Sequence, residues 1–280
     1  MDTKLSEQFE DQGYLVMEGA IPGQELRSIR DAAARIVDEF DVDAHRSIFS
    51  TRDRDRGRDR YFMDSAEAVH CFLEEEALDE DGQLTCGKDR AINKIGHAMH
   101  DLVPEFTRFC RLSVFANTLK ALNYRRPQLW QTMYIFKQPR IGGEVRWHQD
   151  ASYLRSLSSP VLGFWVAIED STRENGCLWV QPGGHHSALR EVYEVDADTG
   201  QGELRTIDDN AWPAPGEGQP VEIPAGSVLV FSDRMPHYSS ANRSERSRQA
   251  FTLHFSEDDA LWSSRNWLQR RRLPPFYLNY

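Results

Sequence analysis

The sequence is poor in cysteine, and no CxxC pair joins its four widely spaced cysteines. This pattern argues against a structural zinc site and against a disulfide framework, and it favours reduced thiols. No apolar run approaches the roughly 20 residues that a membrane helix needs. The amino-terminal stretch MDTKLSEQFEDQG also has no apolar core of the kind found in signal peptides. We therefore expect a cytoplasmic protein without a membrane partner.

The chain also has fewer basic than acidic residues. The chain has 33 lysine and arginine residues against 44 aspartate and glutamate residues, which gives a formal net charge of -11. Such a chain is a poor candidate for binding nucleic acid or an anionic membrane. We expect a small-molecule ligand and no nucleic-acid partner, in a monomer or a weak homodimer.

Hydrophobic residues make up 40% of the 280 residues, which is enough for a sizeable core. Apolar spacing predicts helices over 4–12 and 23–40, and helical periodicity over 88–123. From about residue 128, short runs rich in aromatic and β-branched residues alternate with Gly/Pro turns, which predicts an antiparallel sandwich or barrel. We expect one domain over 1–280. It would comprise a largely helical support (1–125), a β core (126–260) and a carboxy-terminal tail (261–280).

Two polar segments are expected to be loops. Residues 50–60, with the sequence STRDRDRGRDR, contain no apolar side chain that could be buried, which predicts a solvated loop. The less favoured interpretation is the edge of a lid or a loop that contacts an anion. Residues 198–219 predict a long loop between strands.

The stretch RWHQDAS contains a histidine and an aspartate two residues apart, His148 and Asp150. Side chains at i and i+2 of a strand point to the same face, so both can reach one point inside a barrel. Imidazole and carboxylate together suit Fe(II), and two histidines with one carboxylate leave open positions on the metal. The pair alone is a weak signal, and it needs a third ligand.

His237 is the best candidate for that ligand, because it follows the apolar run VLVFSD in a turn near a rim. His185 and His186 lie in a PGGHH turn and are expected to be turn residues, at most on a pocket rim. His97 and His100 fall in the segment expected to be helical, where a hydrogen-bonded or exposed histidine is more common.

A dicarboxylate cosubstrate bound to such a metal would need a cationic partner. Arg248 comes eleven residues after His237, at the start of the next expected strand. An arginine fork binds a carboxylate through two hydrogen bonds. Arg243 and Arg246 are rivals in a polar turn that is expected to face solvent.

These motifs together resemble the phytanoyl-CoA dioxygenase family of Fe(II)/2-oxoglutarate-dependent oxygenases. The resemblance covers most of the chain. It is carried by WHQDAS, WVAIEDSTRENGCLWVQPGGHH, MPHYSSANRSERSRQAFTLHF and FEDQGYLVMEGAIPGQEL. INKIGHAMH, MYIFKQPRIGGEV and NWLQ are most similar to the branch of phytanoyl-CoA dioxygenase domain-containing protein 1.

The resemblance implies a mainly β fold with flanking helices and a double-stranded β-helix core, that is, a cupin-like jelly roll. It implies iron ligands at His148, Asp150 and His237, and Arg248 as the partner of the 2-oxoglutarate carboxylate. Further contacts to the cosubstrate are implied at the following positions: Lys94, Met133, Gln149 and Trp165.

The implied reaction is hydroxylation of a small organic substrate by O2, with release of succinate and CO2 and with ascorbate as a supporting reductant. Halogenating relatives replace the carboxylate ligand with a small residue, whereas this chain keeps Asp150. Two alternatives stay open: a cupin-like metalloenzyme that does not use 2-oxoglutarate, and a non-enzymatic jelly-roll binding protein. The sequence does not identify the substrate, and its acidity gives little support for a CoA thioester.

Overall fold

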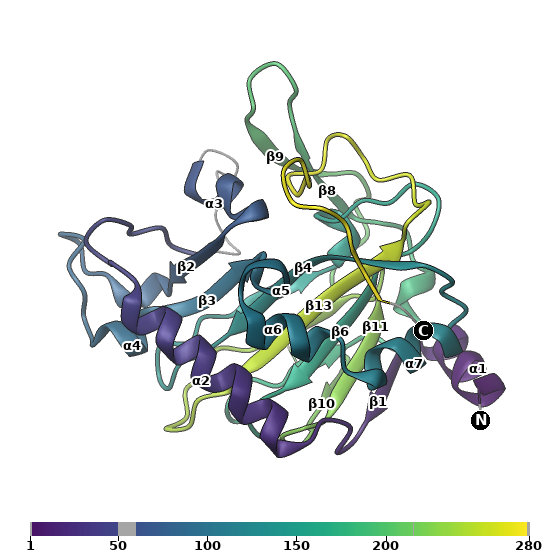
Figure 1. The fold of residues 1–280 in the computed structure, drawn as a ribbon, viewed down its shortest axis with the longest axis horizontal. Helices are drawn as coiled ribbons and strands as arrows, with labels where there is room; N and C mark the ends of the chain where they lie inside the picture. Colours follow the sequence, from purple (N-terminus) through teal and green to yellow (C-terminus); the bar gives the residue numbers. More distant parts are fainter. Residues whose placement is uncertain (1, 50–59, 215, 279–280) are drawn as a thin grey trace.

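The computed structural model describes residues 2–49, 60–214 and 216–278, and within them the fold is mainly β (Figure 1). The large sheet has the order β1-β11-β6-β13-β4-β3-β2, and β14 also pairs with β4. Its strands are β1 (Tyr14–Met17), β2 (Val69–Leu73), β3 (Ile92–His97), β4 (Pro127–Ile135), β6 (Leu162–Ala167), β11 (Val228–Ser232), β13 (Ala250–Glu257) and β14 (Phe276–Tyr277).

A four-stranded sheet has the order β10-β7-β12-β5, and a hairpin is formed by β8 and β9. The strands are β5 (Val145–His148), β7 (Leu178–Val180), β8 (Glu191–Val195), β9 (Gly202–Thr206), β10 (Gln219–Val221) and β12 (His237–Ser239). All paired strands run antiparallel, and side chains of the large and small sheets pack in one apolar cluster. The expected jelly-roll core with flanking helices is confirmed.

The helices lie mainly on the outer face of the large sheet, where α2, α5 and α6 cross it (Figure 1). Helix α2 buries one apolar stripe that includes Leu26, Ile29 and Val37, as its sequence spacing predicts. The helices are α1 (Asp2–Gln12), α2 (Gly23–Glu39), α3 (Arg60–Asp64), α4 (Lys88–Ala91), α5 (Met99–Leu102), α6 (Pro104–Cys110) and α7 (Ser113–Ala121). The helices expected over 4–12 and 23–40 are confirmed.

The helical prediction for 88–123 is wrong at 92–97. Strand β3 occupies 92–97 and pairs with β2 on one side and β4 on the other. Ile92 and Ile95 are fully buried, because the strand joins the large sheet rather than a helix face. The tertiary pairing therefore overrides a local pattern that fits both kinds of structure.

The long loop predicted over 198–219 is interrupted by β9, which pairs with β8 in a hairpin. In Figure 1 this hairpin extends beyond the body of the two sheets. The prediction for 50–60 lies outside the described residues except at Arg60, which begins α3. All four cysteines are free, in line with the expected thiols. Among the described residues, no helix is both long and apolar enough to cross a membrane.

Candidate active site

A cavity of about 160 Å³ lies between the large and the small sheet. Its walls come from β3, β4, β6 and β13 on one side and from β5 and β12 on the other. On β4 the lining residues are Gln131, Met133 and Ile135, at the two-residue spacing of one strand face. The cavity contains the three predicted metal ligands and most of the other predicted site residues.

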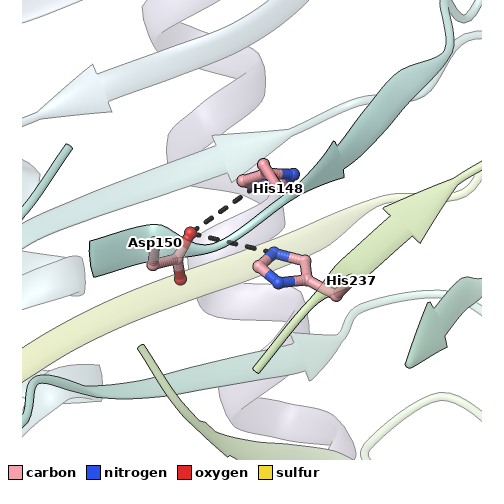
Figure 2. A group of neighbouring side chains, drawn as sticks. All are labelled: His148, Asp150 and His237. Atoms are coloured by element: carbon pink, nitrogen blue, oxygen red, sulfur yellow. Dashed lines mark ion pairs between the residues drawn. The ribbon is translucent and has the colours of Figure 1, made fainter. Parts of the chain in front are cut away.

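His148, Asp150 and His237 offer ligand atoms that all lie within 4.8 Å of one another. The Asp150 Oδ1 atom is 3.6 Å from His148 Nε2 and 3.7 Å from His237 Nε2, and Figure 2 shows both rings turned toward it. His148 and His237 are directly paired across β5 and β12.

The His-x-Asp pair meets as predicted, but not on one strand. Strand β5 ends at His148, and Asp150 begins a short 3-10 helix that spans Asp150–Ser152. His237 is not a rim residue either, since it begins β12 and is only 6% exposed.

The hydrogen bonds of the two imidazoles fix which nitrogen is free. His148 Nδ1 lies 2.9 Å from the carbonyl oxygen of Arg146, and His237 Nδ1 lies 3.0 Å from that of Met235. A carbonyl oxygen can only accept, so each Nδ1 atom carries a proton, and in the neutral form of each ring it is Nε2 that presents the lone pair. Two lone pairs and a carboxylate oxygen converge on one point, and only a cation placed there would satisfy all three.

The protonation states agree with a metal site. Burial and the neighbouring His148 lower the pKa of His237 to about 4, so the ring is neutral at neutral pH. Burial alone would raise the pKa of Asp150, but His237 and His254 outweigh it and hold that pKa well below the usual range. Neutral imidazoles with an ionised carboxylate are the donor set of non-haem Fe(II) sites.

Arg248 lines the same cavity and is 2% exposed. Its Nη2 atom is 3.4 Å from Ser239 Oγ, while Nε and Nη1 have no hydrogen-bond partner within the described ranges. Burial lowers the pKa of its guanidinium to about 10, which still leaves it charged at neutral pH. A buried charged fork with two unpartnered nitrogens is costly, so the arrangement fits a carboxylate ligand.

Lys94, Met133 and Trp165 also line the cavity, as the sequence-based expectation required. The Lys94 Nζ atom lies 3.6 Å from Met133 Sδ. The Trp165 ring lies 5.1 Å from the guanidinium carbon of Arg248. These side chains combine a second positive charge with apolar walls on the Arg248 side of the cavity.

Gln149 is placed differently from the expectation, because its side chain is not among those that line the cavity. It is fully buried, and its Nε2 atom donates to the carbonyl oxygens of Ala188 and Arg234. Its Oε1 atom accepts from the backbone N–H of Arg190. The side chain thus joins three backbone segments on the side away from the two ligands that flank it.

His185 and His186 likewise do not lie on the cavity rim. Each has its Nε2 atom 3.1 Å from the carbonyl oxygen of Glu10, so both rings pack against the end of α1. This contact ties the PGGHH turn to the amino-terminal helix.

Several cavity residues were not predicted. His254 Nε2 lies 2.9 Å from Asp150 Oδ2, and Gln131 Nε2 lies 3.3 Å from His254 Nδ1. The even spacing of His254 from Arg248 is a sequence signal that places both on one face of an extended segment, whereas Gln131 has no such signal. His97 also lines the cavity, but its segment was expected to be helical.

Arg146 and Trp147, which precede His148 in the chain, have clear structural contacts. Arg146 binds Glu191 of β8 through both guanidinium nitrogens, at 3.0 and 2.8 Å. Trp147 stacks on Tyr238, with ring centroids 5.5 Å apart. The strand that carries His148 is therefore held by side chains on both of its faces.

Residues 9–250 match the family model described as "Phytanoyl-CoA dioxygenase (PhyH)". The chain is 40% identical over 276 residues to "Phytanoyl-CoA dioxygenase" of Arabidopsis thaliana, covering 96% of this chain and 94% of the relative. It is 39% identical over 272 residues to "Phytanoyl-CoA dioxygenase domain-containing protein 1 homolog" of Caenorhabditis elegans, covering 95% and 94%.

Among solved structures, the epimerase SnoN in complex with Fe3+, alpha ketoglutarate and nogalamycin RO is similar, with a TM-score of 0.60. The identity is 17%, and the match covers 92% of this chain and 84% of that one. At this identity the similarity is one of fold, and it agrees with the jelly roll described above.

Proposed function

Because this chain belongs to the phytanoyl-CoA dioxygenase family, we propose that it is an Fe(II)- and 2-oxoglutarate-dependent dioxygenase. It hydroxylates a small organic substrate. In the balanced reaction, one O2 gives one oxygen atom to the substrate C–H bond and the other to succinate, and 2-oxoglutarate loses CO2.

The proposed iron ligands are His148, Asp150 and His237. Their Nε2 lone pairs and carboxylate oxygen face one another within 4.8 Å, with both Nδ1 protons held by backbone carbonyls. These carbonyl contacts orient the rings before any metal binds. When bound, iron with 2-oxoglutarate supplies the activation of O2 for hydroxylation, and the protein supplies position and shielding from water.

Arg248 is the observation that carries the 2-oxoglutarate assignment. Its guanidinium is buried in the cavity with two unpartnered nitrogens, which a carboxylate can satisfy in a bidentate pair. Lys94 adds positive charge on the same side, and Trp165 and Met133 give the apolar walls that orient a small dianion. The fold shared with SnoN, a protein solved in complex with Fe3+ and alpha ketoglutarate, supports the same assignment.

Asp150 favours hydroxylation over halogenation. Its Oδ2 atom is 2.9 Å from His254 Nε2, so one carboxylate oxygen is anchored while Oδ1 faces the two ligand histidines. An anchored carboxylate occupies the position that a halide would need.

The test is an anaerobic titration of the Fe(II)-loaded protein with 2-oxoglutarate, followed by a measurement of succinate released in air. We expect a weak visible charge-transfer band on 2-oxoglutarate binding and slow succinate release without substrate. His237→Ala is the control, because it removes one of the two proposed nitrogen ligands, and it should show neither signal.

Iron binding without the band would instead support a cupin-like metalloenzyme that does not use 2-oxoglutarate. Absence of both iron binding and succinate release would support a binding protein. A screen of small molecules for faster succinate release would then identify the substrate.

A further inference from the structure

The cavity has a second, aromatic side that the proposed iron and 2-oxoglutarate ligands leave free. Phe62, Tyr153, Leu154 and Trp267 line it together with His97. His148 faces this side, since its ring centroid is 6.5 Å from that of Tyr153. His97 faces Trp267 at 4.9 Å and Phe62 at 5.7 Å.

His97 stands at the far end of β3 from Lys94. It pairs with Thr132 of β4, whereas Lys94 pairs with Ile135. Three residues along a strand correspond to about 10 Å. The Lys94 end of the cavity holds Arg248, so the His97 end is the space in which a substrate would lie.

The hydrogen bonds of Ser65 decide which nitrogen of His97 faces that space. Ser65 Oγ lies 2.5 Å from the carbonyl oxygen of Phe62 and 2.8 Å from His97 Nδ1. The hydroxyl has one proton, which the carbonyl must receive, so His97 Nδ1–H donates to Ser65 Oγ. The ring is neutral, since burial lowers its pKa well below the usual value. His97 Nε2 is therefore an acceptor, and it makes no hydrogen bond with the part of the chain that the structure describes.

Gln131 provides a second acceptor, as the contacts around it show. His254 Nε2 lies 2.9 Å from Asp150 Oδ2, and the other nitrogen of that ring, Nδ1, lies 3.3 Å from the amide nitrogen of Gln131. The amide nitrogen of Gln131 therefore faces His254, and the amide oxygen points away from that ring. Its Oε1 atom is buried and without a partner among the described residues, and the side chain lines the cavity.

We propose that His97 Nε2 and Gln131 Oε1 are substrate-positioning acceptors, and that the substrate is an uncharged, apolar or aromatic molecule with an O–H or N–H donor. The aromatic side chains enclose its apolar body, and the two acceptors receive its donors beside His148. This inference rests on the proposed function only in calling the bound molecule a substrate. The chemistry expected of that molecule is inferred from the cavity alone. A site built to bind such donors rejects analogues that lack them, because its buried acceptors would stay unpaired.

The test uses pairs of probes in which a methyl group replaces the donor hydrogen: phenol with anisole, and indole with 1-methylindole. Binding to the full-length protein is measured by calorimetry or ligand-observed NMR. Each titration is done on the metal-free protein and again, under anaerobic conditions, with Fe(II) and 2-oxoglutarate. We expect the wild type to bind the donor-bearing member of each pair about 3- to 10-fold more tightly.

His97→Leu and Gln131→Met should each reduce that preference, and His97→Gln should restore part of it because the glutamine amide presents an acceptor near the Nε2 position. His70→Leu is the matched control, since His70 is on the neighbouring strand β2 and is not among the lining residues. It should keep the preference. Gln131→Met provides a test that leaves the Ser65–His97 contact in place.

The proposal is overturned if the wild type binds no probe, if it binds both members of each pair equally, or if His97→Leu and Gln131→Met both keep the preference. Arg248→Ala separates the two proposals. It should weaken 2-oxoglutarate binding and leave the probe preference unchanged. A failure of the cosubstrate assignment can therefore be told apart from a failure of the proposal for His97 and Gln131.

Discussion

His254 holds the carboxylate of Asp150 in place. Its Nε2 atom lies 2.9 Å from Asp150 Oδ2, while Asp150 Oδ1 faces the two histidines of the proposed iron site. One carboxylate oxygen of Asp150 is therefore held by His254, and the other is available to a metal ion. In other metal sites, hydrogen bonds of this kind orient the ligand and raise metal affinity.

We therefore expect His254→Phe to lower the affinity for Fe(II) by roughly 10- to 100-fold, because the Asp150 carboxylate would lose its anchor. His254→Gln, which can still donate, should lose less. Equilibrium dialysis against Fe(II) under anaerobic conditions measures both. Unchanged Fe(II) affinity in the phenylalanine variant would show that His254 does not support metal binding.

Arg248 should determine 2-oxoglutarate affinity through its fork as well as its charge. Arg248→Lys keeps a cation but loses the bidentate geometry, and we expect at least a 10-fold rise in the dissociation constant. Arg248→Ala should raise it by a further 10-fold or more. Titration of the visible band reports both values. Arg246→Ala is the matched control, because Arg246 lies in the exposed turn and does not line the cavity.

Gln149 should act on stability more than on cosubstrate binding. Gln149→Leu leaves the carbonyl oxygens of Ala188 and Arg234 and the N–H of Arg190 without this partner. We expect the free energy of unfolding to fall by roughly 2–4 kcal/mol, measured by urea denaturation. Gln201→Leu, at an exposed position, is the control. A stable Gln149→Leu protein with strongly reduced 2-oxoglutarate affinity would support the direct contact expected from the family resemblance.

Asp233 should make stability depend on pH. Burial, together with the nearby Asp150 carboxylate, raises the pKa of Asp233 to about 7. A raised pKa means that folding favours the protonated form, so its stabilising effect is complete below the unfolded pKa and is lost as the pH rises through about 7.

Asp233→Asn keeps an acceptor for the Val161 N–H, which Asp233 Oδ2 binds at 3.0 Å. Relative to this variant, the metal-free wild type should lose about 1.4 kcal/mol of unfolding free energy per pH unit between pH ~4 and ~7. Urea denaturation of both proteins at several pH values measures the difference. Asp259→Asn changes a side chain that is 71% exposed, and its difference from wild type should stay flat with pH.

The convergence of His148, Asp150 and His237, the position of Arg248 in the cavity and the jelly roll could be predicted, because each depends on short-range signals. These signals are a His-x-Asp pair, a histidine after an apolar run, and alternating strands. Gln149 shows where the family resemblance and the strand pattern point to different positions for a side chain. Side-chain alternation already placed it opposite His148 and Asp150, and the structure follows alternation.

Gln131 and His97 could not be found from the sequence, because their proposed roles depend on contacts with residues far away in the chain. Gln131 gains its unpaired acceptor only through His254, which is 123 positions away. His97 gains its tautomer through Ser65, 32 positions away. Register between β3, β4 and β13 brings these groups together, and local patterns do not specify register.

The pairing of β5 with β12 has a consequence for local opening of the fold. Strand β5 is at the end of the order β10-β7-β12-β5, so in the described structure its ladder is formed with β12 alone. A cation bound by His148 and His237 would cross-link these two strands through their side chains. Metal binding would then be coupled to closure of this edge, and amide hydrogen exchange in β5 should slow when iron is added.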